Sequence, residues 1–538
     1  MKKYIIFSVL LSALMFSSCV KDLDVTPNDP NRILSGSLGN DTLYLEQVLA
    51  KIYASFSISG QWGGNPDIAA GDENFFTTVR ALWNLQEITT DEAICAWGDV
   101  GIADLNTQSW TPANPFLTAL YQRLSISVTY VNDFINQVDA NGHPSADLFK
   151  AEARFLRALA YYWQIDLFGN PPFTTEANGV GLDAPEQGTR VEVYNYIVDE
   201  LNEIIPLLPS AAQVQHSSQA SKEAAQMLLA RLYLNAEVFT GTANWNGVID
   251  ACDAVIAGGA FDLAADYRQN FTADNNYPVN PEMIFAIEYD GVNTQGYVGT
   301  TFIIESSSDA VYVRAEDYHG LTANTNWNGN RARINFMDIL VDTLTTYGGN
   351  PIDANDLEFT QAADGRVYLK QKRSLKIPSP TASGDYGIGV YKFTARNLNG
   401  TLPATYNAAF ACTDFPVFRL ADAYLMRAEA AWRNGDAASA VADINMVRRR
   451  AYGDDSGNIT AGDLDAMFLL DERGREFYYE AQRRTDLVRF GQFTDGTYHW
   501  EWKGNDQNGV ATSAHLDLFP IPADEIAANP KIKQNDNY

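Results

Sequence analysis

Residues 424–450 read YLMRAEAAWRNGDAASAVADINMVRRR, and this stretch decides the fold. Apolar residues recur at helical spacing before and after Gly435 and Asp436, a pair that predicts a turn. Ala428 and Ala431 are small enough to let a second helix approach closely, and Ala440 lies near the start of that helix. The stretch therefore predicts two antiparallel helices joined by a short turn.

Similar amphipathic patterns extend along the chain in two groups. The first group covers the ranges 43–57, 115–138, 145–168, 190–208, 218–239 and 245–257. The second covers 418–434 and 436–452, and a further helix is expected at 471–490. Pairing the helices in chain order gives four helix–turn–helix units of the tetratricopeptide shape, enough to stack into a short solenoid. The predicted fold is therefore mainly α.

Two long inserts interrupt this helical scaffold. They span about 60–112 and 261–413 and are rich in Gly, Asn, Thr and aromatic residues, which leaves about 38–260 and 414–492 for the scaffold. Loops held on a rigid scaffold often carry binding sites, so we expect the ligand-binding surface on the inserts. We also expect 19–538 to form a single body, with the second insert packed onto the solenoid.

The N-terminus has the pattern of a bacterial secretory signal. Lysines at 2–3 precede an apolar run at 4–16 that is too short to span a bilayer. Serines at 17–18 lead directly into Cys19, which resembles the site where bacterial lipoproteins are cleaved and acylated. We therefore predict that residues 1–18 are removed and that a lipid on Cys19 is the sole membrane anchor. The alternative is an ordinary signal peptide that happens to contain a cysteine.

Composition and charge exclude several classes of protein. The formal net charge is −29 over 538 residues, which opposes nucleic acids and anionic surfaces and favours neutral ligands. Three cysteines follow Cys19, namely Cys95, Cys252 and Cys412. Their odd number and wide spacing predict neither a disulfide framework nor a CxxC metal site. The five histidines form no HExxH pair. We expect no nucleic-acid partner, no cofactor and no zinc site.

Several blocks resemble the SusD/RagB family of outer-membrane nutrient-binding lipoproteins. They are CVKDLDVTPNDP at 19–30, AEARFLRALAYYWQIDLFGNPPF at 151–173, TRVEVYNYIVDELNEI at 189–204, DFPVFRLADAYLMRAEAAWRNGD at 414–436, REFYYEAQRRTDLVRFGQF at 475–493 and FPIPADEIAANPKIKQNDNY at 519–538. The resemblance implies a tetratricopeptide scaffold of four helix pairs with a variable ligand-binding surface. It also implies a lipid-anchored protein on the outer face of the outer membrane, capping a SusC-like TonB-dependent transporter.

The inserts resemble those of the starch-binding founding member of the family. The similar stretches are ITTDEAICAW at 88–97, DGVNTQGYVGTTFI at 290–303, NTNWNG at 324–329 and YHWEWKGNDQNG at 498–509. Carried over residue by residue, the resemblance implies an aromatic arc at Trp97, Tyr297 and Trp327. It implies polar contacts to the ligand from Arg80 and Asp72.

This chain departs from the founding member at two places. Where that protein has an asparagine contact, this chain has Val100, which has no hydrogen-bonding side chain, and Asp99 is the neighbour that could replace it. Asp274 and Asp414 resemble positions of a calcium site, but Cys412 stands where an oxygen ligand would be expected. We therefore predict no metal ligands and leave calcium open.

Sugar chemistry suits such an arc. A neutral glycan presents apolar C–H faces alternating with hydroxyls, which match flat aromatic rings and a few polar groups. A rigid arc selects a ligand already coiled to its curvature, as α-1,4-glucan is. We predict non-catalytic capture of starch or a related α-glucan; the first alternative is another glycan or a peptide. The second is a glycoside hydrolase using carboxylates among Asp72, Glu73, Asp91 and Glu92, which would need two carboxyls set across the glycosidic bond.

Overall fold

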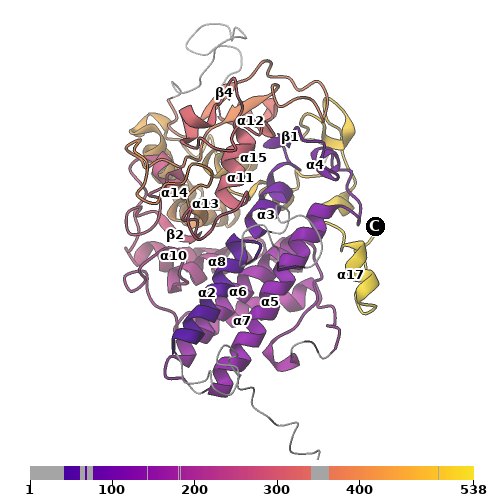
Figure 1. Cartoon of the computed structure of the whole chain (residues 1–538). Coiled ribbons are helices and arrows are strands. Elements are labelled where there is room, and N and C mark those ends of the chain that lie inside the picture. The colour runs from indigo at the N-terminus through magenta and orange to yellow at the C-terminus, as the bar shows by residue number, and fades with distance from the viewer. Residues whose placement is uncertain are drawn as a thin grey trace, which may run out of the picture.

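The computed structural model describes residues 42–60, 67–68, 77–141, 143–179, 181, 183–340, 363–494 and 496–538. Within these ranges the chain is mainly helical, as predicted, with long helices in the lower half of Figure 1 and short strands and loops above them. None of the described helices has the length and apolar character needed to cross a membrane. The predicted signal at 1–18 and Cys19 lie outside the described residues.

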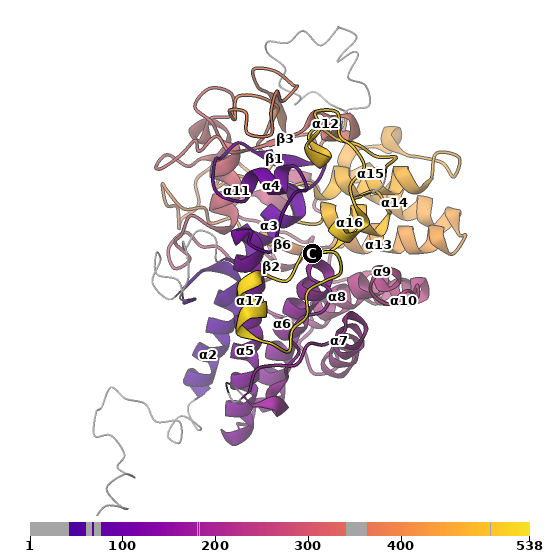
Figure 2. The ribbon, with the colours of Figure 1, turned by 90° about the vertical axis from the view of Figure 1, so that its right-hand side faces the viewer.

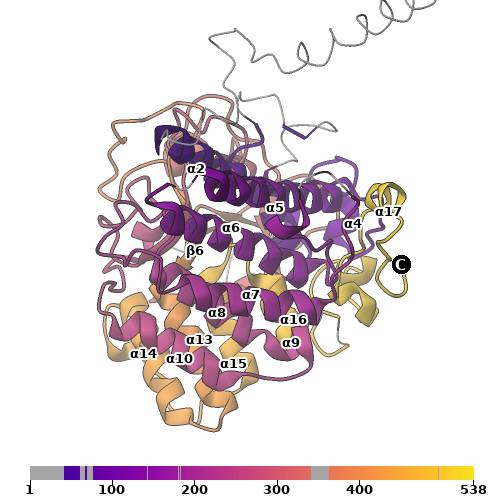
Figure 3. The same cartoon turned by 90° about the horizontal axis from the view of Figure 1, so that it is seen from below.

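The scaffold consists of the four predicted helix pairs. They are α2 (Thr42–Ser57) with α5 (Pro115–Asn141), α6 (Ala146–Leu167) with α7 (Arg190–Ile204), α8 (Lys222–Leu234) with α10 (Trp245–Ala257), and α13 (Leu420–Arg433) with α14 (Ala437–Tyr452). Successive pairs also pack on each other, through α5 against α6, α7 against α8 and α10 against α13. Figure 3 shows this succession from below. The prediction of a tetratricopeptide-like solenoid is thus confirmed.

Local sequence signals explain where these helices begin and end. The Asp436 side chain caps α14 by accepting from the Ser439 N–H at 3.0 Å, and Gly435 before it takes a left-handed φ of 86° that forms the predicted turn. The helix α6 ends before Gly169, whose φ of 77° is also left-handed. Nearly all of α6 after Ala151 is buried, in agreement with its two apolar stripes.

The expected single helix at 471–490 is wrong. It is two helices, α15 (Ala466–Phe477) and α16 (Arg483–Arg489), separated by a break in which Tyr479 and Ala481 adopt left-handed φ values of 64° and 58°. In the break, the N–H of Tyr479 donates to the Glu92 carboxyl and the N–H of Gln482 donates to Glu87 Oε1 at 3.2 Å. Carboxyls from a distant part of the chain thus replace the helical acceptors.

The predicted helix at 218–239 is also divided. It consists of α8 and the shorter α9 (Ala236–Thr240), which are separated by Asn235. The Asn235 Nδ2 donates to the Arg231 carbonyl at 3.0 Å. Shorter 3₁₀ and π turns lie at η1 (Glu176–Asn178), η2 (Tyr267–Phe271), η3 (Ala315–His319), η4 (Asp455–Gly457), η5 (Lys503–Asn505) and η6 (Ala514–Asp517). The C-terminal segment carries α17 (Ala523–Ala528), which lies beside α5 in Figure 2.

The two inserts meet in one small sheet. The first contributes α3 (Thr78–Glu87), β1 (Ala93–Cys95) and α4 (Ile102–Asn106); the second contributes β2 (Met283–Ile287), α11 (Gly299–Ser307), β3 (Asn330–Ala332), α12 (Ile334–Leu340), β4 (Leu369–Gln371) and β5 (Ile388–Val390). The four-stranded sheet has the order β1-β3-β5-β4, with β1 antiparallel to β3. Figure 2 labels β1 and β3 next to each other. A second, two-stranded sheet pairs β2 with β6 (Phe415–Arg419). The first insert is not only loop, because it contains the helix α3, which is buried along its whole length.

A buried ion-pair cluster joins the second insert to the last helices. We define it as Glu282, Arg366, Arg419, Arg450, Glu472, Glu476 and Glu480, all of them with buried side chains. Arg419 lies 2.9 Å from a Glu476 carboxylate oxygen and 2.8 Å from one of Glu480. Arg366 lies 2.7 Å from Glu472. Each charge has partners of opposite sign, which is the condition under which a folded interior tolerates ions.

Candidate functional site

Four partly exposed rings form a continuous row, which we call the ring row. The ring centres of Trp97 and Trp327 are 6.1 Å apart, those of Trp327 and Tyr297 5.6 Å, and those of Tyr297 and Phe410 5.3 Å. These rings come from four separate segments: the end of β1, the approach to α11, the 324–329 loop and the stretch before β6. The structure thus brings together the three aromatic residues predicted for the arc and adds a fourth.

The loop at 324–329 is held by its backbone. The N–H of Trp327 donates to the Glu305 carbonyl at 3.0 Å, and the N–H of Asn328 donates to the Ser308 carbonyl at 2.8 Å. The N–H of Asn326 donates to Glu305 Oε2 at 3.0 Å. These bonds fasten the loop to the C-terminal end of α11, where helix carbonyls have no partner within the helix.

Three asparagines give this loop its shape. Asn324, Asn326 and Asn328 adopt left-handed φ values of 57°, 66° and 52°. Asparagine tolerates this conformation better than other residues with a side chain, apart from aspartate. The left-handed residues on either side of Trp327 turn its side chain outward from the loop, and its ring is partly exposed.

Internal hydrogen bonds fix the orientation of the rings. Trp97 Nε1 donates to the Trp327 carbonyl at 3.1 Å, and Trp327 Nε1 donates to the Asn324 carbonyl at 2.5 Å. Asn324 Nδ2 in turn donates to the hydroxyl of Tyr297 at 2.5 Å. With both indole N–H groups satisfied by the protein, the ring faces are the parts left for a ligand. Such a preorganised surface loses little conformational entropy when it binds.

Arg80 supports the row from beneath. Its side chain lies over the Phe302 ring at 4.6 Å and within 5.8 Å of the Trp97 ring centre, and its Nη1 donates to the Tyr297 carbonyl at 3.2 Å. Arg80 is only 7% exposed. It therefore links the segments that carry Trp97 and Tyr297, while its predicted contact with a ligand stays a prediction.

Of the other predicted polar residues, one is exposed and one lies outside the described residues. Asp99 is exposed two residues beyond Trp97, next to Val100, which is 80% exposed. Asp72 lies outside the described residues, as does Glu73. The role predicted for Asp99 stays a prediction.

Three carboxyls considered for catalysis or found beneath the loop, Asp91, Glu92 and Glu305, are buried and already hydrogen-bonded. Asp91 pairs with Arg483 at 2.7 Å and accepts from the Tyr498 hydroxyl at 2.6 Å, while Glu92 accepts from the break between α15 and α16. Glu305 is fully buried beneath the 324–329 loop, and this burial raises its pKa to about 8. None of these described carboxyls faces another across an open sugar-sized space, which is what glycosidic hydrolysis needs.

The aspartates that resemble a calcium site accept hydrogen bonds from the protein's own backbone, and calcium stays open. Asp414 Oδ1 accepts from the Tyr289 N–H at 2.9 Å, and burial raises the pKa of this carboxyl to about 8. Asp274 Oδ1 accepts from the Leu398 N–H at 2.9 Å. Among the described residues no three Asp, Glu, His or Cys side chains are grouped to hold a metal.

The sequence interpretation missed Phe410 and two supporting residues. Phe410 lies in the loop stretch NAAFAC, where no periodic pattern distinguishes a ring that faces a ligand from one that packs inward. Glu305 and Gly329 support the row from positions that only the folded chain brings near it. The Asn-Trp-Asn pattern at 326–328 was the available signal for the loop itself.

Gly329 is expected to be indispensable to the row. A Cβ at this position would overlap the indole of Trp97, so Gly329→Ala should displace that ring. Near-ultraviolet circular dichroism should show loss of the tryptophan signal that arises from the contact between the Trp97 and Trp327 rings. Gly98→Ala is the matched control, because a Cβ there meets nothing within 4 Å. Identical spectra for the two variants would contradict the packing described for Trp97.

Comparison with known proteins gives a consistent picture. The profile described as "SusD family" matches residues 367–538, and the one described as "Starch-binding associating with outer membrane" matches 69–234. The starch-binding protein SusD of Bacteroides thetaiotaomicron is 34% identical over 100% of this chain and 99% of its own length. SusD-like protein P25 of Formosa agariphila is 24% identical over 77% of this chain and 79% of its own.

Solved structures share the fold. Surface glycan-binding protein A from Bacteroides fluxus superposes with a TM-score of 0.68 at 21% identity, covering 93% of this chain and 100% of its own. Surface glycan-binding protein A from Bacteroides thetaiotaomicron, solved with laminarihexaose, gives a TM-score of 0.67 at 19% identity over 92% and 100% of the two chains. At this identity the likeness concerns the fold alone.

Proposed function

Because the chain belongs to the SusD family, we propose that it captures starch-type α-glucan at the outer membrane and does not hydrolyse it. The observation that carries the proposal is the ring row, in which Trp97, Trp327 and Tyr297 converge from distant segments with both indole N–H groups already bonded. The full-length likeness to a starch-binding protein supports α-glucan as the ligand. The captured glycan would pass to a SusC-like TonB-dependent transporter.

The physical match is between a rigid curved surface and a coiled ligand. Neighbouring rings in the row are tilted by 51° and 67° to each other, so the row turns along its length. A coiled α-1,4-glucan can follow such a turn while keeping its C–H faces on successive rings. The net charge of −29 does not repel a neutral ligand of this kind.

The absence of catalysis is part of the proposal. The buried carboxyls Asp91, Glu92 and Glu305 are all engaged in hydrogen bonds within the protein. Retaining and inverting hydrolysis both need two carboxyls that reach the bond from opposite sides. We therefore expect no reducing ends to be released from bound glucan.

Ring truncation is the direct test of the site. Isothermal titration with maltoheptaose should give micromolar to millimolar affinity, about −4 to −8 kcal/mol. Trp97→Ala and Trp327→Ala should each weaken binding by about 1–3 kcal/mol, since each removes one large apolar contact face. Phe410→Ala should weaken the binding of maltoheptaose more than that of maltotriose, because Phe410 lies at the end of the row, where only the longer sugar is expected to reach.

Control variants show whether a loss of affinity is specific to the ring row. Trp432→Ala changes a partly buried tryptophan on α13 that packs far from the row, and should leave the affinity unchanged. Equal affinity in the wild type and both row variants would place the site elsewhere. Laminarihexaose in the same panel tests a β-glucan, and reducing-sugar release followed in parallel would make the protein an enzyme.

Membrane attachment is proposed to depend on the lipid at Cys19. No described helix is long and apolar enough to cross a bilayer, and multiple acyl chains give stable anchoring where one does not. Cys19→Ala should therefore move the protein from the outer-membrane fraction to the medium or periplasm. The fractionation is done in cells lacking the transporter, so that docking cannot retain the protein. Retention of Cys19→Ala in those membranes would refute the lipid anchor.

A further inference from the structure

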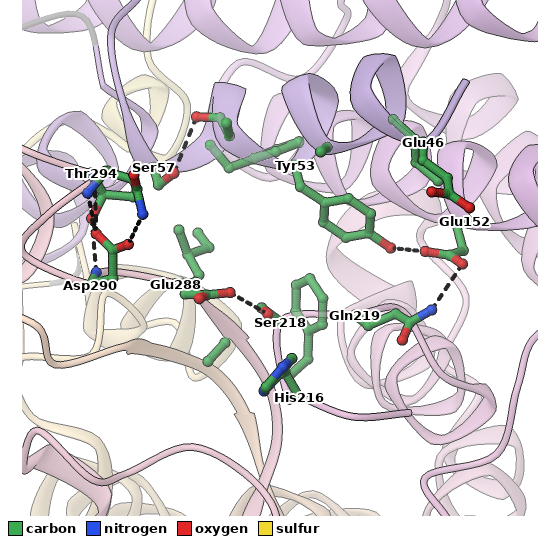
Figure 4. A pocket seen from close by; sticks show the side chains of 18 of the residues that line it. Glu46, Tyr53, Ser57, Glu152, His216, Ser218, Gln219, Glu288, Asp290 and Thr294 are labelled. Carbon is green, nitrogen blue, oxygen red and sulfur yellow. Dashed lines mark hydrogen bonds between the residues drawn. The ribbon is translucent and has the colours of Figure 1, made fainter. Parts of the chain in front are cut away.

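A cavity of about 670 Å³ lies on the scaffold between α2, the start of α6 and the end of β2 (Figure 4). We call it the α2–β2 pocket. Its apolar walls include Leu49, Phe56, Phe149, Leu159, Phe285 and Ile287. Its volume is within the roughly 300–1,000 Å³ typical of ligand pockets. No residue of the ring row lines it.

The charged groups around this pocket are acidic. Glu46, Glu152, Glu288 and Asp290 all line it, and among the described lining residues there is no lysine or arginine. Glu46 and Glu288 are exposed at its margin. The remaining ionisable groups that line it are His216, also exposed, and Tyr53. The electrostatic potential at the mouth therefore favours a cation.

The polar groups inside are largely satisfied by the protein. Glu152 accepts from the Tyr53 hydroxyl at 2.7 Å and from Gln219 Nε2 at 3.1 Å, as Figure 4 shows. Partial burial alone would raise the pKa of Asp290, but hydrogen bonds from the backbone of its own turn outweigh burial and lower that pKa, which keeps the side chain anionic. The walls thus suit apolar groups and the rim suits positive charge.

We infer that the α2–β2 pocket docks a segment of a partner protein that inserts apolar side chains and places lysine or arginine on the rim. Charge complementarity selects this occupant, because Glu46, Glu288 and Asp290 border the apolar walls and no lysine or arginine is among the described lining residues. A neutral glycan fits less well, since the phenylalanine rings that line the pocket, Phe56, Phe149 and Phe285, are buried and offer little open ring face for a sugar to stack on. The net charge of −29 would also draw a basic partner toward the surface.

Two labelled peptides test the inference by fluorescence anisotropy. The first is Lys-Arg-Leu-Leu-Phe-Arg-Lys, and the second has glutamate in place of each basic residue. The wild-type chain should bind the basic peptide at least tenfold more tightly than the acidic one. Ala50→Phe, which fills the pocket from an exposed position on α2, should weaken the basic peptide at least tenfold. Ala438→Phe, an exposed alanine on α14, is the size-matched control.

Reversing the charge of the rim residues is an independent test of the same inference. Glu46→Lys combined with Glu288→Lys should reverse the preference between the peptides, whereas Asp199→Lys, an exposed change on α7, should not. Maltoheptaose should not compete, because the ring row is a separate site. The inference is overturned if the wild type binds neither peptide or both equally, if Ala50→Phe binds like the wild type, or if maltoheptaose displaces the probe.

Discussion

Glu476→Ala is expected to destabilise the folded protein by about 3–5 kcal/mol, the cost of removing one partner from a buried ion pair. Glu476 lies within 2.9 Å of Arg419 and 3.3 Å of Arg366, and it also pairs with Arg450. All four side chains are buried. Removing the carboxylate takes one partner from each of three buried guanidinium groups, which then depend on Glu282, Glu472 and Glu480 alone within the cluster.

Urea unfolding at neutral pH, followed by far-ultraviolet circular dichroism, measures this loss. Glu203→Ala is the matched control, because Glu203 pairs with Arg154 at 2.5 Å while its side chain is 68% exposed. Exposed pairs contribute only about 0.2–1 kcal/mol. If the two variants lost the same stability, the ion-pair cluster would not be the element that joins the second insert to the last helices.

The stability of the protein is expected to be greatest at about pH 5 and to fall on both sides. Burial alone would raise the pKa values of Glu472 and Glu476, but Arg366 beside the first and Arg450 beside the second outweigh it and lower both to about 2. Their stabilisation is complete above the unfolded pKa of 4.5 and is lost as the pH falls toward 2.

Glu305 acts in the opposite direction. Burial raises its pKa from 4.5 to about 8, so its contribution is complete below 4.5 and is lost as the pH rises through 8. The loss is a few kcal/mol, at about 1.4 kcal/mol for each unit of pKa difference. Asp414 has the same direction, since burial raises its pKa to about 8.

Urea midpoints between about pH 3 and pH 9 test both limbs of this profile. Glu305→Gln keeps the shape of the side chain and an acceptor for the Asn326 N–H, but it cannot ionise. Its stability relative to the wild type should therefore rise from about pH 5 to pH 9. Glu46→Gln, an exposed change on α2, should run parallel to the wild type. A wild-type midpoint that increases steadily across this alkaline limb would disprove the role given to Glu305.

The scaffold could be predicted from the sequence because its signals are local. The helical period, the small residues Ala428 and Ala431, and the Gly435–Asp436 turn all act within a few residues of one another. The break between α15 and α16 could not be predicted in this way. It depends on Glu87 and Glu92, which lie in the first insert, far away in the sequence, and accept from the backbone at the break.

Residues of the candidate site could be predicted only where the residue type and its neighbours in the sequence both indicated an exposed ring. A tryptophan between asparagines, as at Trp327, indicates a displayed ring, and family resemblance added Trp97 and Tyr297. Phe410 shows no such pattern, since its place in the row follows from the fold of the second insert around Tyr297. The contacts of Arg80 with the Phe302 ring and the Tyr297 carbonyl could not be predicted, because they join segments that are far apart in the sequence, and its contact with a ligand stays a prediction.

The asparagine loop separates the frame of the site from the ring that it displays. The loop's own backbone N–H groups fasten residues 326–329 to α11, and the bond from Trp97 is to the carbonyl of residue 327, not to its side chain. A different side chain at 327 would therefore keep the backbone position of Trp327, although it would lose the indole bond to the Asn324 carbonyl. The asparagines at 326 and 328, with their left-handed φ values, maintain the shape of the loop independently of which side chain it displays between them.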